Sequence, residues 1–507
     1  LKHGFINLNF LLQLWSRDNK NKIFISLLCL GLIILIFSYL ASFNISKEFY
    51  NVTSDVNGEN GLAVLNWLNI GILDLKFGKY VSGYLENKNF NFQETKKDFY
   101  THHPVFFLIP TYFTYKIFGI SELTTKISSF IFSIIGLISF FLIIYYITKN
   151  LAFSLSNSLF LSLLPIFIYY GTTFEVVIFT VTSILITYVF FILYYYSKKE
   201  IYFYLTLASI FLGGLMTWFY FFMPASIWFY LLFFEKDRKF NNQRKKLLIW
   251  LPLISIFVFS LNLLHIYILK GSEGLFDLKN AFLGRSQKLP LIPWIKTLEF
   301  RFDHAYTKFF LLFSLAGLFF FFTKFKEYKI FLPLLLMPIL NTFVFSQWVT
   351  HPFGVIFFAP IIALLTTIFL KESILNLDKS FLKITILCLF IVISFYFSYK
   401  NLDFWVNKFL ILDPNDINLL KEIKNQINHD ELCLGKNEMG LYYGGIVMWY
   451  LRKNIFFSPE CLENQNIKYV LIFNPQLGEF YQKETMNFLN KGFKPIGCSG
   501  YFCILSK

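Results

Sequence analysis

The sequence predicts a mostly helical membrane protein with about eleven spans and a small C-terminal α/β domain outside the membrane. Of the 507 residues, 56% are hydrophobic and 21% aromatic, and the mean hydropathy is +0.55. Soluble domains carry about a quarter charged residues, whereas this chain carries 15%. Apolar runs of about 20 residues recur, as membrane-spanning helices require. The composition changes abruptly near Lys400, where the apolar runs end.

The first apolar run, 23–43, follows Arg17, Lys20 and Lys22 and has no small-residue cleavage site after it. We therefore predict an uncleaved span rather than a signal peptide. The other predicted spans have a comparable apolar character: 127–147, 151–170, 174–194, 201–217, 218–234, 247–269, 306–322, 330–345, 355–370 and 381–399. They define a transmembrane domain over 1–399, with a long outer loop at about 44–126, and a separate domain over 400–507.

The positions of the basic residues predict the topology. The net charge is +15, and an eleven-span arrangement gathers lysines and arginines in alternate loops, as cytoplasmic loops do. These residues are Lys149, Lys198, Lys199, Lys236, Arg238, Lys239, Arg244, Lys245, Lys246, Lys324, Lys326, Lys329, Lys371 and Lys379. The charge thus indicates a cytoplasmic membrane face rather than nucleic-acid binding. It places the N-terminus in the cytoplasm and the 400–507 domain outside.

An apolar stretch at 104–118 is expected to lie on the membrane surface. Counting it as a further span would place the most basic loop outside, against the rule that positive loops face the cytoplasm. The alternative, that it crosses the membrane, stays open at this point.

The 400–507 domain is expected to mix helices with strands. Helices are predicted at 416–428 and 480–490, and strands at 432–434, at 468–473 and near the end. Four cysteines fall in this domain, where an oxidising compartment permits disulfides of unassigned pairing. They are Cys433, Cys461, Cys498 and Cys503. Metal binding by these cysteines is a weaker alternative because no close CxxC spacing is present.

The long outer loop holds the first candidate site. Asp55 and Glu59 are four residues apart, so a helix that begins near Asp55 places both carboxylates on one face. Paired carboxylates suit a general base. The alternative is structural, with Asp55 as the N-cap and Glu59 as a solvated acid of the first turn. His102 and His103 precede Pro104, where imidazoles suit a phosphate or, alternatively, hydrogen bonds to headgroups or backbone.

Four further residues lie in segments predicted to face outward. Glu175 stands at the outer end of a span, where an acid beside hydrocarbon is costly unless it is used or paired. Arg285 and Arg301 lie in a predicted outer loop at 270–304, and such cations suit a phosphate leaving group. His351 lies in a short outer turn. Solvated charge is the alternative for the two arginines, and an interfacial ion pair or tyrosine contact is the alternative for Glu175.

These groups match what glycosyl transfer from a lipid carrier demands. A carboxylate must take the proton of an acceptor hydroxyl while that hydroxyl attacks the anomeric carbon. The departing lipid phosphate is a stable anion that needs positive charge but no proton.

An ordered set of motifs follows the first span. It comprises Ser54 and Asp55 with Glu59 and Ala63 after them, YTHHP at 100–104, FGISE at 118–122 followed by Lys126, and YYGTTFE at 169–175. This order resembles that of the GT-C glycosyltransferases, especially the protein O-mannosyltransferases and the bacterial lipid A aminoarabinose transferases. The resemblance covers about 20–400, and the 400–507 segment is similar to the small periplasmic domain of many bacterial members.

The resemblance implies a GT-C fold and a metal-independent, inverting transfer from a polyprenyl-phosphate sugar to a hydroxyl of a lipid, glycan or protein. It assigns Asp55 as the base and Glu59 as the second loop carboxylate, and it implies no cofactor. Many members carry Asp where this chain has Glu175 and Arg where it has Lys126. Both differences keep the charge, although a lysine point charge holds phosphate differently from an arginine fork.

Two other classes of function remain open. A transporter or flippase of lipid-linked glycans would show internal repeats and charges at mid-membrane, and the sequence shows no repeat and few ionisable residues in the spans. A surface-polysaccharide ligase or polymerase, by resemblance, has its large loop late in the chain rather than first. In every case the expected location is the inner (plasma) membrane of a bacterium, and the expected partners are a lipid-linked sugar, its acceptor and membrane lipids.

Overall fold

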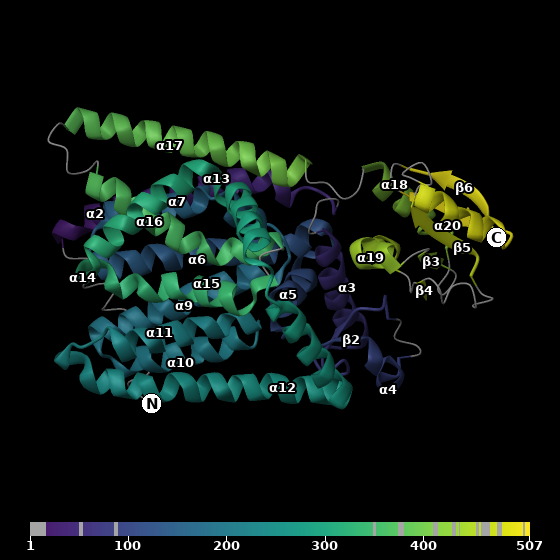
Figure 1. The fold of residues 1–507 in the computed structure, drawn as a ribbon, viewed down its shortest axis with the longest axis horizontal. Coiled ribbons are helices and arrows are strands. Elements are labelled where there is room, and N and C mark those ends of the chain that lie inside the picture. The colour runs from purple at the N-terminus through teal and green to yellow at the C-terminus, as the bar shows by residue number, and fades with distance from the viewer. Residues whose placement is uncertain are drawn as a thin grey trace.

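The computed structural model describes residues 17–49, 54–85, 90–347, 351–373, 380–408, 414–427, 432–434, 437–452, 456–457, 467–473, 479–499 and 502–507. A bundle of long helices forms one part of the molecule, and a small mixed domain forms the other (Figure 1). Helices α3 (Ser54–Ile70) and α5 (Ile109–Phe118) lie at the end of the bundle that faces the small domain. This end is called the α3 end below.

Every predicted span is helical where the structure describes it. Eight helical segments are long and apolar enough to cross a membrane, and a bent pair, α7 (Leu151–Leu163) with α8 (Pro165–Gly171), makes up to nine. Two shorter apolar helices, Glu200–Gly214 and Trp218–Phe233, correspond to the remaining two predicted spans. The chain is thus a multi-pass membrane protein. Besides α7 and α8, the helices of the bundle are α2 (Arg17–Ile45), α6 (Glu122–Thr148), α9 (Val176–Ser197), α10 (Glu200–Gly214), α11 (Phe222–Phe233), α12 (Asn241–Ser286), α13 (Leu291–Thr323), α15 (Leu332–Val344), α16 (Ala359–Ser373) and α17 (Ser380–Asp403).

Local sequence explains where several helices begin. Ser121 caps α6, since its side chain accepts a hydrogen bond from the Thr124 N–H while Thr124 bonds back to the Ser121 backbone. Pro165 ends α7, because proline disfavours helical geometry at the residue before it, and it begins α8 at an angle of 69° to α7. This break brings the chain to Glu175, directly before α9.

The segment 104–118 does not contain a helix long enough to span. A 3-10 turn at Phe106–Leu108 leads into α5, which has 10 residues and therefore rises only about 15 Å, half of a bilayer core. Before it, β1 (Lys79–Tyr80) pairs antiparallel with β2 (Phe99–Tyr100), and α4 (Phe92–Thr95) lies between them in sequence.

The segment predicted as an outer loop at 270–304 is helical for most of its length. Helix α12 continues to Ser286 through a break at Gly271, where φ is +67°, and α13 begins at Leu291. Glycine tolerates this positive φ without a side-chain clash. The polar residues that suggested a loop therefore project from helices.

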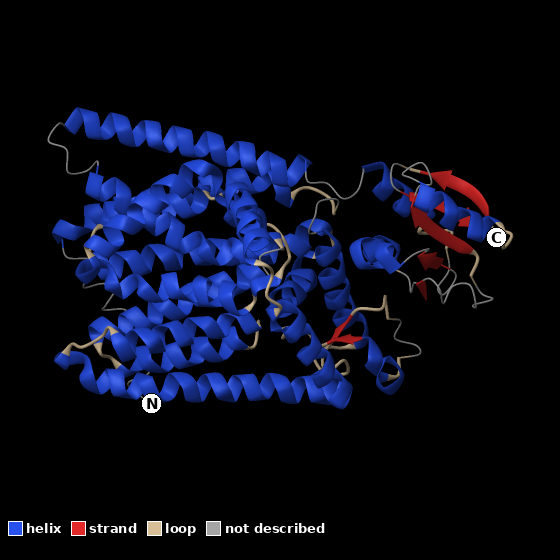
Figure 2. Cartoon of the chain, viewed as in Figure 1, coloured by secondary structure: helices blue, strands red, loops and turns tan. Residues whose placement is uncertain are grey.

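The small domain contains a five-stranded sheet in the order β4-β3-β5-β7-β6 (Figure 2). The strands are β3 (Leu432–Leu434), β4 (Phe456–Phe457), β5 (Tyr469–Phe473), β6 (Lys494–Cys498) and β7 (Phe502–Ser506). β3 is parallel to β4 and β5, whereas β7 is antiparallel to β5 and β6. The helices are α18 (Pro414–Ile423), α19 (Asn437–Leu451) and α20 (Glu479–Leu489), so the predicted α/β character is confirmed.

The three cysteines of this domain that the structure describes are disulfide-bonded. Cys498 pairs with Cys503 across β6 and β7, and Cys433 is disulfide-bonded as well. Cys461 lies outside the described residues. Cys29 and Cys388, within α2 and α17, are free thiols.

Candidate active site

A polar cavity of about 280 Å³ lies at the α3 end of the bundle. Its walls come from α3, the β1–β2 ribbon, the start of α9, the end of α12 and the turn at 351–353. The lining residues are Val56, Glu59, Asn60, Lys79, Tyr100, His103, Val105, Phe107, Glu175, Val176, Arg285, His351 and Phe353. Five predicted site residues from five separate segments therefore meet here: Glu59, His103, Glu175, Arg285 and His351.

Glu59 is held in an ion pair within this cavity. The Lys79 ammonium lies 2.5 Å from the Glu59 carboxylate and 4.5 Å from the centre of the Tyr100 ring. The ribbon explains this placement, because Lys79 is the cross-strand partner of Tyr100. Trp67 of α3 fixes the ribbon by donating from its indole N–H to the Gly78 carbonyl at 2.7 Å. Glu59 is therefore a paired acid, not the solvated one of the structural alternative.

Asp55 lies one helical turn before Glu59, in the first turn of α3. Its Oδ1 accepts a hydrogen bond of 2.7 Å from the Gly445 N–H of α19. Burial, reinforced by the negative charge of Glu59, raises the pKa of Asp55 to about 7, although the backbone hydrogen bonds and Lys79 oppose the rise. A carboxyl group with this pKa exchanges protons near neutral pH, as a general base requires.

Glu175 is 4% exposed and precedes the first residue of α9. Two asparagines of α3 hold the adjacent turn: the Phe174 N–H donates to Asn57 Oδ1 at 2.5 Å, and Asn60 Nδ2 donates to the Phe174 carbonyl at 2.9 Å. Within the described part of the chain, the buried Oε2 of Glu175 accepts no hydrogen bond. A buried carboxylate oxygen in this state is costly and is available to a hydroxyl group of a ligand.

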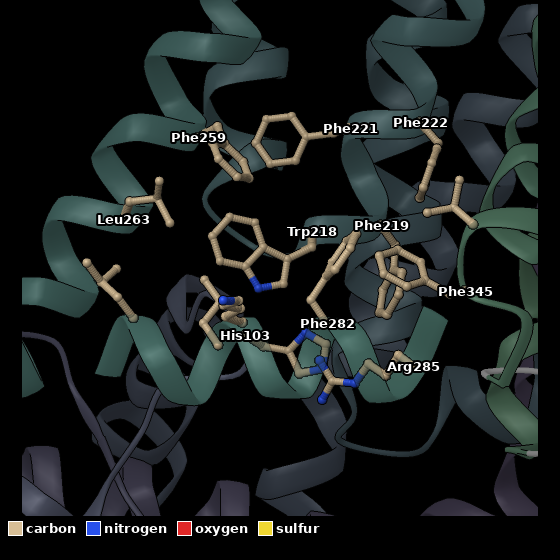
Figure 3. A pocket seen from close by; sticks show the side chains of 14 residues that line it. His103, Trp218, Phe219, Phe221, Phe222, Phe259, Leu263, Phe282, Arg285 and Phe345 are labelled. Carbon is tan, nitrogen blue, oxygen red and sulfur yellow. The ribbon is translucent and has the colours of Figure 1, made fainter. Parts of the chain in front are cut away.

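Arg285 and His103 stand between the polar cavity and a second, apolar one. The second cavity measures about 590 Å³ and is lined by both residues together with Trp218, Phe219, Phe221, Phe222, Phe259, Leu263, Leu275, Leu278, Lys279, Phe282, Val344 and Phe345. Figure 3 shows aromatic rings around this cavity and the side chains of His103 and Arg285 at one end of it. The two cavities thus share a cationic boundary.

The YTHHP segment fixes that boundary. The His102 carbonyl accepts hydrogen bonds from Trp218 Nε1 at 2.9 Å and from Arg285 Nη1 at 3.3 Å. Burial, with Arg285 nearby, holds the pKa of His103 well below its usual range, so this imidazole is neutral at pH 7. The His102 ring does not line either cavity, and its backbone carbonyl makes the contacts instead.

Two predicted cations lie elsewhere. The Lys126 ammonium of α6 is buried and donates to the carbonyls of Asn44 and Lys47 at 2.9 and 2.7 Å, so it holds the end of α2. Arg301 of α13 lies near the buried Tyr170 and is not among the residues that line the polar cavity. The role of either residue with phosphate stays a prediction.

Lys79, Tyr100 and Trp218 are site residues that the sequence reasoning missed. Strands of two residues are too short to show alternating hydrophobicity, so no pattern marked the ribbon. The YTHHP motif did contain Tyr100, and it was the available signal. Among the described residues no group of three or more His, Cys, Asp or Glu side chains could hold a metal ion.

Comparison with known proteins supports the fold through structure rather than sequence. No family model and no curated protein sequence matches the chain. ArnT from Cupriavidus metallidurans, in a crystal structure with undecaprenyl phosphate bound, is similar with a TM-score of 0.61 at 10% identity, covering 94% of this chain and 98% of ArnT. The oligosaccharyltransferase of Archaeoglobus fulgidus, in its apo form, gives a TM-score of 0.58 at 12% identity, covering 94% and 74% of the two chains. Both are membrane glycosyltransferases of the GT-C type, and this chain has the GT-C fold.

Proposed function

We propose that the protein transfers a sugar from a polyprenyl-phosphate carrier to an acceptor hydroxyl, with inversion at the anomeric carbon. The observation that carries the proposal is the junction of two cavities at Arg285 and His103. One cavity is apolar and the other holds carboxylates, which suits a ligand with a hydrocarbon tail, a phosphate and a sugar. Undecaprenyl phosphate is the ligand bound in the ArnT structure.

Different parts of the site bind the tail, the phosphate and the sugar of the donor. The prenyl tail lies in the apolar cavity, where burial of hydrocarbon favours binding by roughly 25 cal/mol per Å². The Arg285 guanidinium binds the phosphate at the boundary, since its fork of N–H donors matches phosphate oxygens. The sugar then lies in the polar cavity between Glu59, Lys79 and Glu175.

The transfer is a single displacement. Asp55 takes the proton of the acceptor hydroxyl while its oxygen forms a bond to the anomeric carbon, and the bond from that carbon to the phosphate oxygen breaks. Polyprenyl phosphate departs as an anion beside Arg285. Asp55 suits the base better than Glu59, because Lys79 neutralises Glu59, whereas no salt bridge reaches Asp55 among the described residues.

The acceptor hydroxyl belongs to a lipid, a glycan or a protein. We further propose that the α3 end faces the outside of a bacterial inner membrane and that the N-terminus is cytoplasmic. Helix α14 (Phe325–Tyr328), which Lys324 and Lys329 flank, lies at the end of the bundle away from α3 (Figure 1). In this orientation its basic residues face the cytoplasm, as positive cytoplasmic loops do.

The test uses the full-length protein in lipid nanodiscs with a panel of polyprenyl-phosphate sugars and added acceptors, and it measures release of free polyprenyl phosphate. Asp55→Asn should lower the transfer rate by about 10²- to 10⁴-fold, the usual contribution of a general base. Asp74→Asn is the control, since Asp74 is an exposed carboxylate beyond the end of α3.

Two results would contradict the proposal. A folded Asp55→Asn variant with the wild-type rate would remove Asp55 as the base. If the folded wild-type protein binds the lipids but releases no polyprenyl phosphate with any donor, the result would instead support transport of lipid-linked glycans.

A further inference from the structure

The C-terminal domain touches the helix of the candidate base with no side chain in between. A Cβ atom at Gly58 of α3 would lie 2.4 Å from the Gly445 carbonyl oxygen of α19. A Cβ atom at Gly445 would lie 2.3 Å from the Asp55 carbonyl oxygen and 2.9 Å from the Glu59 backbone nitrogen. Contacts this short do not occur for real Cβ atoms, so the packing of α19 on α3 requires glycine at both positions.

This close approach brings the backbone of α19 to the carboxylate of Asp55. The Gly445 N–H donates to Asp55 Oδ1 at 2.7 Å, and the Ile446 backbone also hydrogen-bonds to Asp55. Two backbone donors on one carboxylate stabilise its charged form and restrict its rotamer. No other described element supplies a backbone donor to this side chain.

Further contacts fix the same domain at the α3 end. The Phe49 N–H, which follows α2, donates to the Tyr450 hydroxyl at 3.2 Å. Lys421 of α18 lies 2.5 Å from Glu48, and the Trp449 ring packs at 5.5 Å from that of Phe49. These contacts come from two helices of the small domain, so its position is set at several points rather than by a tether alone.

We propose that the C-terminal domain is part of the active site, and that Gly445 is a positioning residue that holds the Asp55 carboxylate in place for proton transfer. The inference rests on the proposed function, because it assumes that Asp55 is the base. Reactive groups must be held to within about 0.5 Å of productive geometry, and the first turn of a helix does not hold an aspartate side chain that closely by itself. The domain supplies the missing constraint.

The first test is Gly445→Ala in the full-length protein, with Gly497→Ala as the control. Gly497 lies in β6 of the same domain, and a Cβ there would only reach a leucine methyl at 4.0 Å. Gly445→Ala displaces the donors, so the pKa of Asp55 should rise by about one unit. Transfer at pH 7 should fall about fivefold, because the deprotonated fraction of Asp55 falls from about one half to about one tenth. It should recover at pH 9, and the KM for the lipid donor should stay at the wild-type value, because Gly445 lines neither cavity. Gly497→Ala should match the wild type.

Two further variants guard against misfolding of Gly445→Ala. Gly58→Ala separates the same helices from the membrane side, since its Cβ meets backbone atoms of Gly445, and it should reproduce the shift of the pH profile. Tyr450→Phe introduces no clash and removes only the hydroxyl, which accepts from the Phe49 N–H and also hydrogen-bonds to Glu122, so a smaller shift in the same direction is expected. Wild-type rates and pH profiles in all folded variants would overturn the inference.

A direct titration separates this inference from the proposed function. Infrared difference spectra recorded over a pH series, with Asp55→Asn as the reference, give the pH midpoint at which the Asp55 carboxyl group titrates. This measurement does not require that the protein transfers sugar. A higher midpoint in Gly445→Ala supports the positioning role even if no donor has been identified. An unchanged midpoint overturns that role even if the wild-type protein is an active transferase.

Discussion

Two buried glutamates at opposite ends of the bundle have opposite surroundings. Glu235 lies at the end of the bundle away from α3, near Lys329 and α14 (Phe325–Tyr328) (Figure 1). Its carboxylate accepts hydrogen bonds from the hydroxyls of Tyr195 and Tyr230 at 2.8 and 2.9 Å and from the Asp237 N–H at 2.7 Å. Glu175, at the α3 end, is equally buried, yet its Oε2 accepts no hydrogen bond within the described residues.

The difference in hydrogen bonding distinguishes a structural carboxylate, Glu235, from a candidate functional one, Glu175. The fold is able to satisfy a buried carboxylate fully, as it does for Glu235, where each oxygen has a donor. It leaves one oxygen of Glu175 open toward a cavity that contains cations and a second carboxylate. Strongly perturbed charged groups of this kind gather at functional sites. The comparison therefore predicts that Glu175 serves a ligand and Glu235 serves stability.

The largest expected effect is that of Glu175→Gln. Burial raises the pKa of Glu175 to about 8, so its carboxyl group can exchange a proton with a substrate hydroxyl near neutral pH. Transfer should fall about 100-fold, because the amide cannot exchange a proton in this range. The melting temperature should stay the same or rise, since the substitution removes a buried carboxyl group whose Oε2 accepts no hydrogen bond among the described residues. Rate and thermal unfolding are measured on the same preparation. A large loss of stability with full activity would assign Glu175 the role expected of Glu235.

The pH dependence of the rate is the next largest effect. Burial raises the pKa of Asp55 to about 7, and a base must be deprotonated, so kcat/KM should rise with pH and level off above about 7. Below that value the rate should fall about tenfold per unit, which gives about 100-fold at pH 5. The control is the residual rate of Asp55→Asn, which should not fall as the pH decreases from 7 to 5. A flat wild-type profile between pH 5 and 8 would argue against Asp55 as the base.

The boundary between the two cavities gives the third prediction. Arg285→Ala should raise the KM for the lipid donor about 10- to 100-fold, since a charge-assisted hydrogen bond contributes about 1.5–3 kcal/mol. Lys279→Ala is the matched control, because Lys279 lines the apolar cavity only and should change KM less than about threefold. Binding of polyprenol, which lacks the phosphate group, should not change in Arg285→Ala. Equal effects of the two substitutions would place the phosphate elsewhere.

Most of the fold was predictable because a bilayer imposes a simple length rule. The spans followed from apolar runs, and the α/β character of the small domain followed from its short elements. The helices of the 270–304 segment were not predicted, since Lys270, Arg285 and other polar residues suggested a loop although they belong to α12 and α13. The 437–451 helix was missed because its glycines lower helix propensity, and here they serve the contact with α3.

Five of the predicted site residues line the polar cavity, whereas Asp55, His102, Lys126 and Arg301 do not, and the contacts of the site could not be predicted from the sequence. Asp55, Glu59 and Glu175 were identified by charge placed next to apolar segments. Their partners, Lys79 and Gly445, come from a two-residue strand and from a helix 390 residues further on. No local sequence pattern links positions so far apart. Only the folded chain shows that Glu59 forms an ion pair with Lys79 and that the small domain hydrogen-bonds to Asp55.

The smallest effect on activity should come from Glu235→Gln, which completes the comparison. The amide cannot accept every hydrogen bond that the carboxylate accepts, and it leaves Lys329 without its charge partner at 3.9 Å, so unfolding should become easier by about 1–3 kcal/mol. The transfer rate per folded molecule should change less than about twofold, because Glu235 touches neither cavity. Thermal unfolding and transfer in nanodiscs measure both quantities. A 100-fold loss of rate at unchanged stability would mean that hydrogen-bond satisfaction does not distinguish the structural carboxylate from the functional one in this fold.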